Sequence, residues 1–527
     1  MAPSSTKSAD IINVESSPTE SQISPSSDLK VEVEHEEQHE SSSDKHIDLV
    51  HHDLKELEKS GLWYHKRIIP GIPPYSNSFV QIIVMSFVIF LTPGCFNAIT
   101  GIGNSGISDP KVADNANVAL YSCFATIGAF SGVICNYIGV KACLMFGGTG
   151  YFMYTASLLV FHQTGNKGFP VFAGAYLGVC AALTWAAQGS IVMSYALEHK
   201  KATAIMVYWV IFNCGAVIGS IIPLAQNMTT GDSHVNAGTY VAFMILMAGG
   251  VVLAGFMLPM DKVYKSDGTK VIAKKYPKIT HEIKGMWKVL KTEGKIYFMF
   301  PMFCASNWFY TYQFNNFNAA RFNVRTRSLN GLLYWLTQMV GAIVIGFLLD
   351  WKRFKRPMRA KLGWIVIFLF GMATWGGGLK FQLGVTRENV DDDPLIDFHD
   401  SNYIGPMFLY MCYGGFDAIF QSYIFWVLGT FSNNPKKVAL YASFYKSLQS
   451  AFNAIVWRLD AQKTPFMHMF ASSWALVVVS MLIAAPMIFF KITEHTNAED
   501  DDIDDMMDDE EITTVRDNEE AKDAKEA

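Results

Sequence analysis

Twelve stretches of this chain are apolar over about the length of helix that crosses a lipid bilayer. The hydrocarbon core is about 30 Å thick, which takes about 20 residues of α-helix. Lipid offers no hydrogen-bond partner to a free backbone group, so each crossing segment must satisfy its own N–H and C=O groups. The sequence therefore predicts an all-α membrane protein with twelve transmembrane helices. These span residues 77–100, 114–138, 143–162, 169–194, 204–226, 238–259, 296–319, 329–350, 360–382, 402–428, 438–459 and 467–491.

Two acidic tails flank a basic, apolar body. Residues 1–60 hold 14 acidic and 5 basic side chains, and residues 494–527 hold 16 and 3. Both tails are too polar to bury the apolar surface that would offset chain entropy, so we expect them to be disordered. The predicted organisation is a disordered N-terminal tail (1–60), a six-helix half (61–259), a basic cytoplasmic linker (260–295), a second six-helix half (296–493) and a disordered C-terminal tail (494–527).

The basic loops predict the orientation, because cytoplasmic loops carry the excess of lysine and arginine. With both termini in the cytoplasm, the five inner connections hold 21 such residues, and the outer loops hold about a third as many. Asn227 opens the chain's one N-x-T sequon, on a predicted outer loop, so we expect glycosylation there. The host membrane is expected to be the plasma membrane or an endomembrane such as the vacuole.

A short pattern occurs once in each half. The first copy holds Gly132, Asn136 and Gly139, and the second holds Gly346 and Asp350 followed by a basic turn. This pair resembles the G-x-L-x-D-R-x-G-R motif of the major facilitator superfamily, in which glycine permits close helix contact and the carboxylate caps a neighbouring helix. The acid is missing from the first copy and present in the second, so we expect the contact between the halves to be weaker or reversed.

A closer resemblance covers nearly the whole apolar body. It rests on TPGCFNAITGIG in the first span, VYWVIFNCGAVIGSIIPLAQN in the fifth, YQFNNFNAARFNVRTRSLNGLLYWLTQ across the seventh and eighth, and YGGFDAIFQSYIFWVLG in the tenth. These segments resemble the uncoordinated-ninety-three-like family, and the long tails resemble its fungal members. The resemblance implies the twelve-helix facilitator fold. It also implies one of two roles, since animal members are regarded as channel regulators or trafficking partners and others as transporters.

Polar residues within a bilayer are costly and usually face the interior of a helix bundle. In the seventh span Asn315, Asn318, Arg321 and Arg325 recur every three or four residues, so a regular helix would place them on one face. Such a face could bind an anionic or polar solute entering from outside, because a guanidinium fits carboxylate and phosphate. Alternatively these groups bind neighbouring helices or the acidic outer loop at 391–400.

Asp417 is the one carboxylate near the middle of a predicted span, and Lys446 lies at a comparable depth in the next span. An unpaired charge at that depth would be expensive, so we expect the two to pair or to share a water-filled cavity. Asp417 is then either a protonatable coupling group or half of a static ion pair. Gln421 extends the face of Asp417, and Gln449 and Asn453 extend that of Lys446.

The first half contributes fewer polar candidates. Asn97 follows a Pro-Gly pair that could loosen the first helix and expose its carbonyls. The others are Gln188, Trp209 and Asn213. Each of them either contacts a neighbouring helix or lines a central cavity together with the seventh span.

Enzyme motifs are missing from the sequence, which has no phosphate-binding GxxxxGK[ST] loop, no HExxH and no GxSxG. All eight cysteines fall in or beside apolar runs, so we expect neither disulfides nor zinc. The sequence predicts no cofactor, no metal and no nucleic-acid partner. We expect a facilitator-type transporter that moves a small polar or anionic solute by alternating access, with proton coupling as an option. The alternative is a non-transporting regulator of a channel or receptor subunit.

Overall fold

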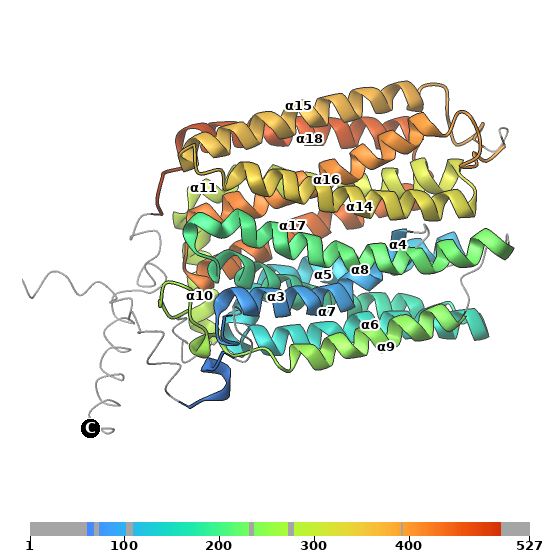
Figure 1. Ribbon diagram of the computed structural model, residues 1–527. Coiled ribbons are helices and arrows are strands. Elements are labelled where there is room, and N and C mark those ends of the chain that lie inside the picture. Colours follow the sequence, from blue (N-terminus) through green and yellow to red (C-terminus); the bar gives the residue numbers. More distant parts are fainter. Residues whose placement is uncertain are drawn as a thin grey trace, which may run out of the picture. The chain divides into compact units, whose positions relative to one another are not determined.

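The computed structural model describes residues 61–67, 73–101, 109–230, 237–271, 279–390 and 394–496 (Figure 1). Their regular secondary structure is helical, with only isolated bridge contacts such as that between Phe322 and Ile396. The predicted N-terminal tail, and the C-terminal tail from residue 497 onward, lie outside the described residues. The outer-loop residues 391–393 do as well.

Helices follow each predicted span of the first half. The Asn77 side chain accepts a hydrogen bond from the Phe79 N–H and so caps the first helix, while Asp109 caps the second through the Lys111 N–H. The elements are α3 (Ser78–Ile89), the π-helical η2 (Phe90–Gly94), α4 (Cys95–Gly101), α5 (Pro110–Ile138), α6 (Val140–Thr164), α7 (Gly168–Ser194), η4 (Glu198–Lys200), α8 (Lys201–Thr230) and α9 (Ala237–Ala254).

The second half follows an amphipathic linker helix, α10 (Ile279–Thr292). Its long helices are α14 (Val324–Leu349), α15 (Arg356–Gln382), α16 (Ile404–Phe431), α17 (Pro435–Ala461) and α18 (Phe466–Phe490). The seventh span, expected as one helix over 296–319, is broken instead. It comprises α11 (Gly294–Tyr297), α12 (Phe300–Ala305), α13 (Trp308–Thr311) and the π-helical η6 (Tyr312–Ala319).

The breaks in the seventh span have local causes. Pro301 has no N–H to donate and therefore occupies the first turn of α12. Asn307 has backbone angles of φ −130° and ψ −3°, outside the helical region, and separates α12 from α13. The run of apolar residues predicted a crossing segment correctly but concealed these interruptions.

Nine helices among the described residues are long and apolar enough to cross a membrane. The broken seventh segment, α16 and α17 do not meet that standard. From Tyr413 onward every residue of α16 is buried, and α17 carries polar side chains along its buried face, so neither helix needs a purely apolar surface. The count of twelve crossings stays a prediction.

The surfaces that face outward are apolar in both halves. Ile245 on α9 and Phe347 on α14 are each 68% exposed, and Leu369 on α15 is 62% exposed. Large exposed apolar side chains spread over several helices would be unstable in water and are suited to acyl chains. The chain is therefore an integral membrane protein that crosses the bilayer several times.

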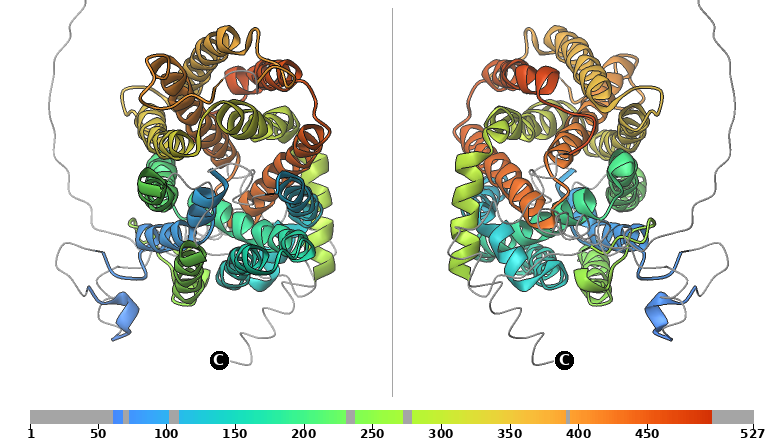
Figure 2. Two further views of the ribbon diagram at one scale, coloured as in Figure 1. Left: turned by 90° about the vertical axis from the view of Figure 1, so that its right-hand side faces the viewer. Right: turned by 90° about the vertical axis from the view of Figure 1, so that its left-hand side faces the viewer.

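Helices of the two halves contact each other along two long seams. Helix α5 packs against α17, and α8 packs against α14, while α5 and α7 form a close pair inside the first half. Figure 2 shows the helices nearly end on, with the red and orange helices largely on one side and the blue and green ones on the other. The boundary between the halves is where a solute site would lie.

The repeated glycine motif lies on these seams. A Cβ on Gly132 of α5 would fall 2.8 Å from the Ala439 carbonyl oxygen of α17, and one on Gly346 of α14 would fall 2.7 Å from Met206 Cβ of α8. Each copy therefore brings its helix close to the opposite half. Gly139 ends α5 at φ +87°, and Asn136 lies in the last turn of that helix.

The intact carboxylate of the second copy caps a helix of the first half. Asp350 accepts hydrogen bonds from the Ala202 N–H at 3.3 Å and the Thr203 N–H at 2.6 Å, and from the Thr203 hydroxyl at 2.6 Å. These donors belong to the first turn of α8, where a negative charge is favoured by the helix dipole. Arg359 of α15 lies 3.9 Å from the same carboxylate.

Packing of α5 against α7 depends on glycine. A Cβ at Gly178 would lie 2.2 Å from the Leu120 carbonyl oxygen, whereas a Cβ at Gly249 of α9 meets no atom within 4 Å. Gly178→Ala should therefore destabilise the fold by about 1–3 kcal/mol through overpacking. Gly249→Ala should leave the melting temperature in detergent unchanged or slightly raised. Equal melting temperatures for the two variants would contradict this account of the α5–α7 contact.

Candidate functional site

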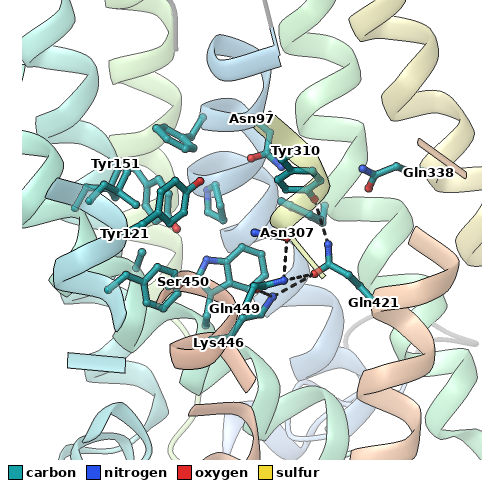
Figure 3. A pocket seen from close by; sticks show the side chains of 18 of the residues that line it. Asn97, Tyr121, Tyr151, Asn307, Tyr310, Gln338, Gln421, Lys446, Gln449 and Ser450 are labelled. Carbon is teal, nitrogen blue, oxygen red and sulfur yellow. Dashed lines mark hydrogen bonds between the residues drawn. The ribbon is translucent and has the colours of Figure 1, made fainter. Parts of the chain in front are cut away.

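A cavity of about 90 Å³ lies between the two halves (Figure 3). A water molecule needs about 10–15 Å³ on this measure, so the cavity has room for several waters or a small solute. Its walls come from η2, α4, α5, α6, α7 and α8 of the first half and from the Asn307–Tyr310 region, α14, α16 and α17 of the second. The polar side chains that line it are Asn97, Tyr121, Tyr151, Asn307, Tyr310, Gln338, Gln421, Lys446, Gln449 and Ser450.

Lys446 is the one charged side chain in this lining. Its ammonium donates to the Gln449 amide oxygen at 2.9 Å and to the Gln421 amide oxygen at 3.4 Å. It also lies 4.5 Å from the ring centre of Trp185 and 4.6 Å from that of Tyr445. Cation–π contact and neutral acceptors stabilise the cation without neutralising it, so a positive field remains at the cavity wall.

Asp417 lies fully buried behind the cavity wall. Its carboxylate accepts hydrogen bonds from the Tyr310 hydroxyl at 2.7 Å, the Gln338 amide at 2.6 Å and the Gln421 amide at 2.7 Å. The Tyr334 hydroxyl follows at 3.5 Å. The donors come from α13, α14 and α16, so one carboxylate joins three elements of the second half.

Gln421 lies between the two charges. It is one turn after Asp417 on α16, and its amide nitrogen donates to Asp417 while its oxygen accepts from Lys446. Among the described residues no direct ion pair joins Asp417 to Lys446, which differs from the simplest form of the expected pairing. The reason is geometric, since the glutamine fills the space in which the two charges would meet.

The network continues into the first half and into the broken seventh segment. Trp209 of α8 donates its indole N–H to the Gln338 oxygen at 3.2 Å, and Gln338 in turn donates to Asp417. The Gln449 amide donates to the Ser306 hydroxyl at 2.8 Å and to the Asn307 side-chain oxygen at 2.9 Å. Six of the ten polar lining residues therefore belong to one connected set of hydrogen bonds: Asn307, Tyr310, Gln338, Gln421, Lys446 and Gln449.

Five residues of this network were missed by sequence reasoning: Ser306, Asn307, Tyr310, Tyr334 and Gln338. They carry no charge, and Tyr310 lies in an aromatic run that is typical of packing or interfacial residues. One usable indication was present, because Asn307 interrupts an apolar segment that has no other reason to contain an amide. Of the eleven predicted cavity residues, the structure places Asn97, Trp209, Gln421 and Gln449 in the cavity wall.

The polar face predicted for the seventh span does not line this cavity. The amides of Asn315 and Asn316 donate to the two oxygens of Asp460 on α17, at 2.8 and 2.9 Å. Asn318 accepts from Asn330 of α14 at 2.9 Å. The expectation assumed a period of 3.6 residues, but Tyr312–Ala319 is π-helical, with i→i+5 hydrogen bonds that rotate successive side chains differently.

The two arginines after that segment bind the protein itself. Arg321 is buried and donates to the Phe381 carbonyl and the Gln382 amide oxygen, both at 2.9 Å. Arg325 forms an ion pair of 2.5 Å with Asp397 of the loop between α15 and α16. The alternative in which these arginines meet the acidic loop thus matches the structure for Arg325.

Asp397 is held ionised by this contact. Burial by itself raises the pKa of the carboxyl, but hydrogen bonds from the Arg325 guanidinium and the Asn323 amide outweigh it and lower the pKa to about 2. A depressed pKa means that the contact stabilises the fold above the ordinary carboxyl pKa of about 4 and is lost as the pH falls toward 2. The loop should stay attached over the whole physiological range.

The other predicted residues are buried but lie away from the cavity wall. The Asn213 amide donates to the Trp209 carbonyl at 2.9 Å. The side-chain amides of Gln188 and Asn453 have no hydrogen-bond partner among the described residues. The sequon residue Asn227 falls in the last part of α8, and its side chain lies outside the described part, so its glycosylation stays a prediction.

The loosened first helix expected at the Pro-Gly pair is present as the π-helical η2. A Cβ on Gly94 would fall 2.8 Å from the Phe212 carbonyl oxygen, and one on Gly215 would fall 2.4 Å from the Phe90 carbonyl oxygen. The widened turn therefore packs directly against the α8 backbone, and it places Pro93 in the cavity wall beside Asn97.

Known proteins resemble this chain over most of its length. A family model described as Major Facilitator Superfamily matches residues 28–220. An UNC93-like protein of Schizosaccharomyces pombe is 49% identical over 431 residues, covering 81% of this chain and 86% of the relative. The chain belongs to the UNC93-like family. UNC93-like protein 1 of Arabidopsis thaliana is 37% identical and covers 82% of this chain and 94% of its own length.

Solved structures share the fold of this UNC93-like chain. The proton:xylose symporter XylE aligns with a TM-score of 0.56 at 11% identity, covering 81% of this chain and 98% of the symporter. A bacterial homologue of the iron transporter ferroportin, in an outward-facing state, aligns with a TM-score of 0.56 at 10% identity. The alignment covers 78% of this chain and 99% of the homologue. The predicted major-facilitator fold is thereby confirmed, and so is the fungal type of the family resemblance.

The position of Gln421 predicts how the two buried charges communicate. Asp417→Asn and Lys446→Met should each lower the melting temperature in detergent, and the double variant should lose less than their sum. The coupling free energy should be about 0.5–3 kcal/mol, as is usual for residues in one polar network.

Repeating that cycle in a Gln421→Met background provides the control. Methionine keeps the volume but offers neither the amide donor nor its oxygen, so the coupling should fall close to zero. Undiminished coupling would mean that the charges interact through space and that the glutamine is a bystander.

Proposed function

We propose that this UNC93-like protein is a transporter that carries a small solute with an anionic group through the cavity between its halves. The observation that carries the proposal is Lys446, a buried cation in a cavity wall whose other polar groups are neutral. A positive charge that has no ion-pair partner in the cavity wall would attract a carboxylate or similar group and would be stabilised by it. The fold supports the proposal, since the neighbouring structures include a proton:xylose symporter and a fucose:proton symporter.

The cavity wall suggests how such a solute would be held. The Lys446 ammonium would bind the anionic group, with the amide of Asn307 beside it as a further donor. Trp185 and Tyr121 offer flat apolar surfaces to the remainder of the solute. A volume of about 90 Å³ limits that remainder to a few heavy atoms unless the halves move apart.

Proton coupling through Asp417 is the second element of the proposal. An ionised carboxylate accepts from Tyr310, Gln338 and Gln421 at once, whereas a protonated carboxyl must donate one hydrogen bond and can release a donor. Gln338 also accepts from Trp209 of the first half. Protonation would therefore change a contact that joins the two halves, which is what coupled alternating access requires.

The orientation follows from the loop charges. We place both termini in the cytoplasm, which puts Asp350 and the start of α8 at the cytoplasmic end of the bundle. The hydrogen bonds from Ala202 and Thr203 to Asp350 then close the inner side, and they would have to break for release of solute inward.

Charge removal at the cavity tests solute binding. In vesicles containing the purified protein, uptake would be measured for labelled small carboxylates, sugars and amines. At least one carboxylate should be taken up, and Lys446→Gln should reduce that uptake by about tenfold, the effect of losing one charge-assisted hydrogen bond. Lys352→Gln, which removes an exposed cation from the loop after α14, is the matched control and should transport normally.

Two outcomes would contradict the proposal. Equal uptake by Lys446→Gln and the wild type would remove the lysine from the binding site. Uptake of none of the solutes, together with a channel or receptor subunit that co-purifies in fixed ratio, would favour the regulator.

The variant Asp417→Asn tests whether solute uptake is coupled to protons through this carboxyl group. Asparagine resembles the uncharged carboxyl, so uptake should become independent of a pH gradient while exchange of labelled for unlabelled solute continues. The wild type should take up solute faster when the external side is acidic. If Asp417→Asn retains gradient-driven uptake at the wild-type rate, the coupling group lies elsewhere.

A further inference from the structure

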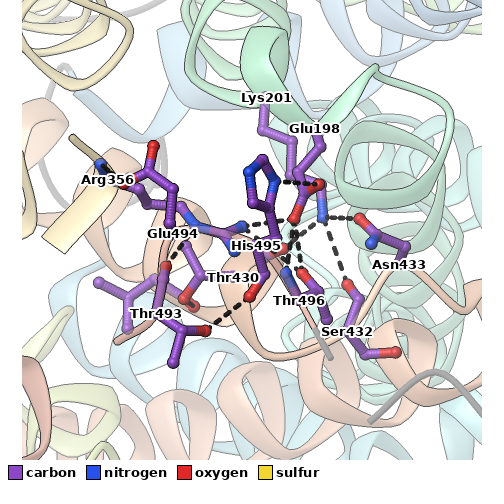
Figure 4. Close-up of polar contacts among 12 residues, drawn as sticks. Glu198, Lys201, Arg356, Thr430, Ser432, Asn433, Thr493, Glu494, His495 and Thr496 are labelled. Atoms are coloured by element: carbon purple, nitrogen blue, oxygen red, sulfur yellow. Dashed lines mark hydrogen bonds and ion pairs between the residues drawn. The ribbon is translucent and has the colours of Figure 1, made fainter. Parts of the chain in front are cut away.

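A group of polar contacts at one end of the bundle joins the halves through the start of the C-terminal tail (Figure 4). Glu198, in the connection between α7 and α8, belongs to the first half. Arg356 begins α15, and Thr496 follows α18 by six residues, so both belong to the second half. We call these three residues the inner clasp.

Glu198 is the centre of the clasp. Its Oε1 atom accepts hydrogen bonds from the Thr496 N–H at 2.9 Å and from the Thr496 hydroxyl at 2.8 Å. The same oxygen forms an ion pair of 2.7 Å with Arg356. His495 adds its imidazole at 3.7 Å from the other carboxylate oxygen, although that ring is 82% exposed. One carboxylate of the first half thus binds both the start of α15 and the segment that follows α18.

Arg356 is buried and binds the tail backbone as well. Its Nε donates to the Thr493 carbonyl at 2.7 Å, and its backbone N–H donates to the Glu494 carboxylate at 3.0 Å. Its Nη1 lies 3.5 Å from the Thr496 hydroxyl, and its Nη2 has no hydrogen-bond partner among the described residues. The guanidinium of this residue, which is 3% exposed, therefore has one unused donor, while its Nη1 atom lies beside the threonine hydroxyl.

Lys201 ties the halves together nearby but does not involve the tail. Its ammonium donates to the Gly429 carbonyl, to the Ser432 carbonyl at 3.3 Å and to the Asn433 side-chain oxygen at 2.6 Å. The contacts of Lys201 would persist if Thr496 separated from Glu198. The inner clasp is consequently the part of the closure that the tail can control.

The sequence after Thr496 has a specific character. Thr496 is followed by Asn-Ala-Glu-Asp-Asp-Asp, so acidic residues stand at the third to sixth positions beyond it. Thr493 is followed by Glu-His-Thr and has no acid at the third position. A protein kinase with a basic substrate groove would select Thr496 and not Thr493, because the acidic residues after Thr496 complement the charge of the groove.

We propose that Thr496 is a phosphorylation site and that its phosphorylation opens the inner clasp. The kinase would transfer the γ-phosphoryl group of ATP to the Thr496 hydroxyl oxygen. A P–O bond to that oxygen forms while the bond to ADP breaks, and the hydroxyl proton leaves to the kinase base. The proposal rests on the cytoplasmic placement of the C-terminus but does not depend on which solute is carried.

Phosphorylation reverses the contacts of the clasp. The hydroxyl loses the proton that it donates to Glu198, and a group of about −1.5 to −2 charge comes to lie beside that carboxylate. The phosphate can take the unused Nη2 donor of Arg356 and compete for Nη1, because guanidinium binds phosphate in a two-pronged manner. Arg356 then pairs within the second half, and Glu198 of the first half is repelled.

The first test is direct modification of the folded protein. The full-length chain in detergent would be incubated with ATP and a kinase that selects acidic sequences, and the modified sites would be read by mass spectrometry. Thr496 should be phosphorylated and Thr493 should not. Glu499→Ala should slow the reaction by about tenfold, as expected for loss of one charged contact.

The second test measures the distance between the halves. Lys200 and Lys355 are exposed neighbours of Glu198 and Arg356, so a short amine-reactive cross-linker should join them when the clasp is closed. Phosphorylation should lower the cross-link yield by about half or more, since a population shift past 1:1 removes half of the closed form. Thr496→Glu should do the same. Thr493→Glu is the matched control, because among the described residues the Thr493 hydroxyl bonds within the tail, to the His495 carbonyl, and not to Glu198 or Arg356.

Either of two results would overturn the proposal. In the first, Thr496 stays unmodified in the full-length chain while a free peptide of residues 490–505 is phosphorylated. In the second, Thr496 is modified but the cross-link yield is unchanged. Both readings come from the purified wild-type chain, so they remain informative if Thr496→Glu fails to fold and if no solute is transported.

Discussion

A carboxylate buried in the middle of a membrane protein must collect enough hydrogen bonds to replace its water, and Asp417 imposes that demand on the second half. Its partners come from α13, α14 and α16, and Gln338 extends the chain of contacts to Trp209 in the first half. Satisfying one charge therefore fixes the relative positions of several helices. The second-half side of the cavity wall is largely the inner surface of this arrangement, which explains why most of its polar groups are connected.

Backbone irregularity follows the same rule. Lipid cannot satisfy a backbone group released from a helix, so departures from the α-helix have to be buried in protein or face a polar cavity. The π-helical η2 holds its buried Thr92, Pro93 and Gly94 against α8, and six of the eight residues of η6 are buried. Both widened segments belong to the corresponding first helix of each half. The first of them places Pro93 in the cavity wall, whereas the second turns its amides toward α17 and α14.

The sequence reveals the features that depend on single residues and their depth. Apolar runs locate the helices, the shared motif anticipates that Asp350 caps a neighbouring helix, and counting along the spans brings Asp417 and Lys446 to similar depths. Features that depend on how helices face one another are not visible in this way. Helical spacing assigns Asn315 and Asn318 to a cavity because it assumes a regular helix, and the π-helical turn rotates them toward α17 and α14. Because Gln338 is uncharged, the sequence alone does not indicate that it links Asp417 to Trp209.

The amide of Gln421 has two chemically different ends, and each end binds a charge of opposite sign. A carboxylate needs the NH₂ end and an ammonium needs the oxygen, so only one of the two planar orientations of this amide suits both neighbours. The two charges therefore fix the orientation of the amide. Turning it by 180° would place its oxygen against the Asp417 carboxylate and its NH₂ group against the Lys446 ammonium. The orientation of the amide therefore depends on the charges of Asp417 and Lys446. If either of the two became neutral, the amide could rotate.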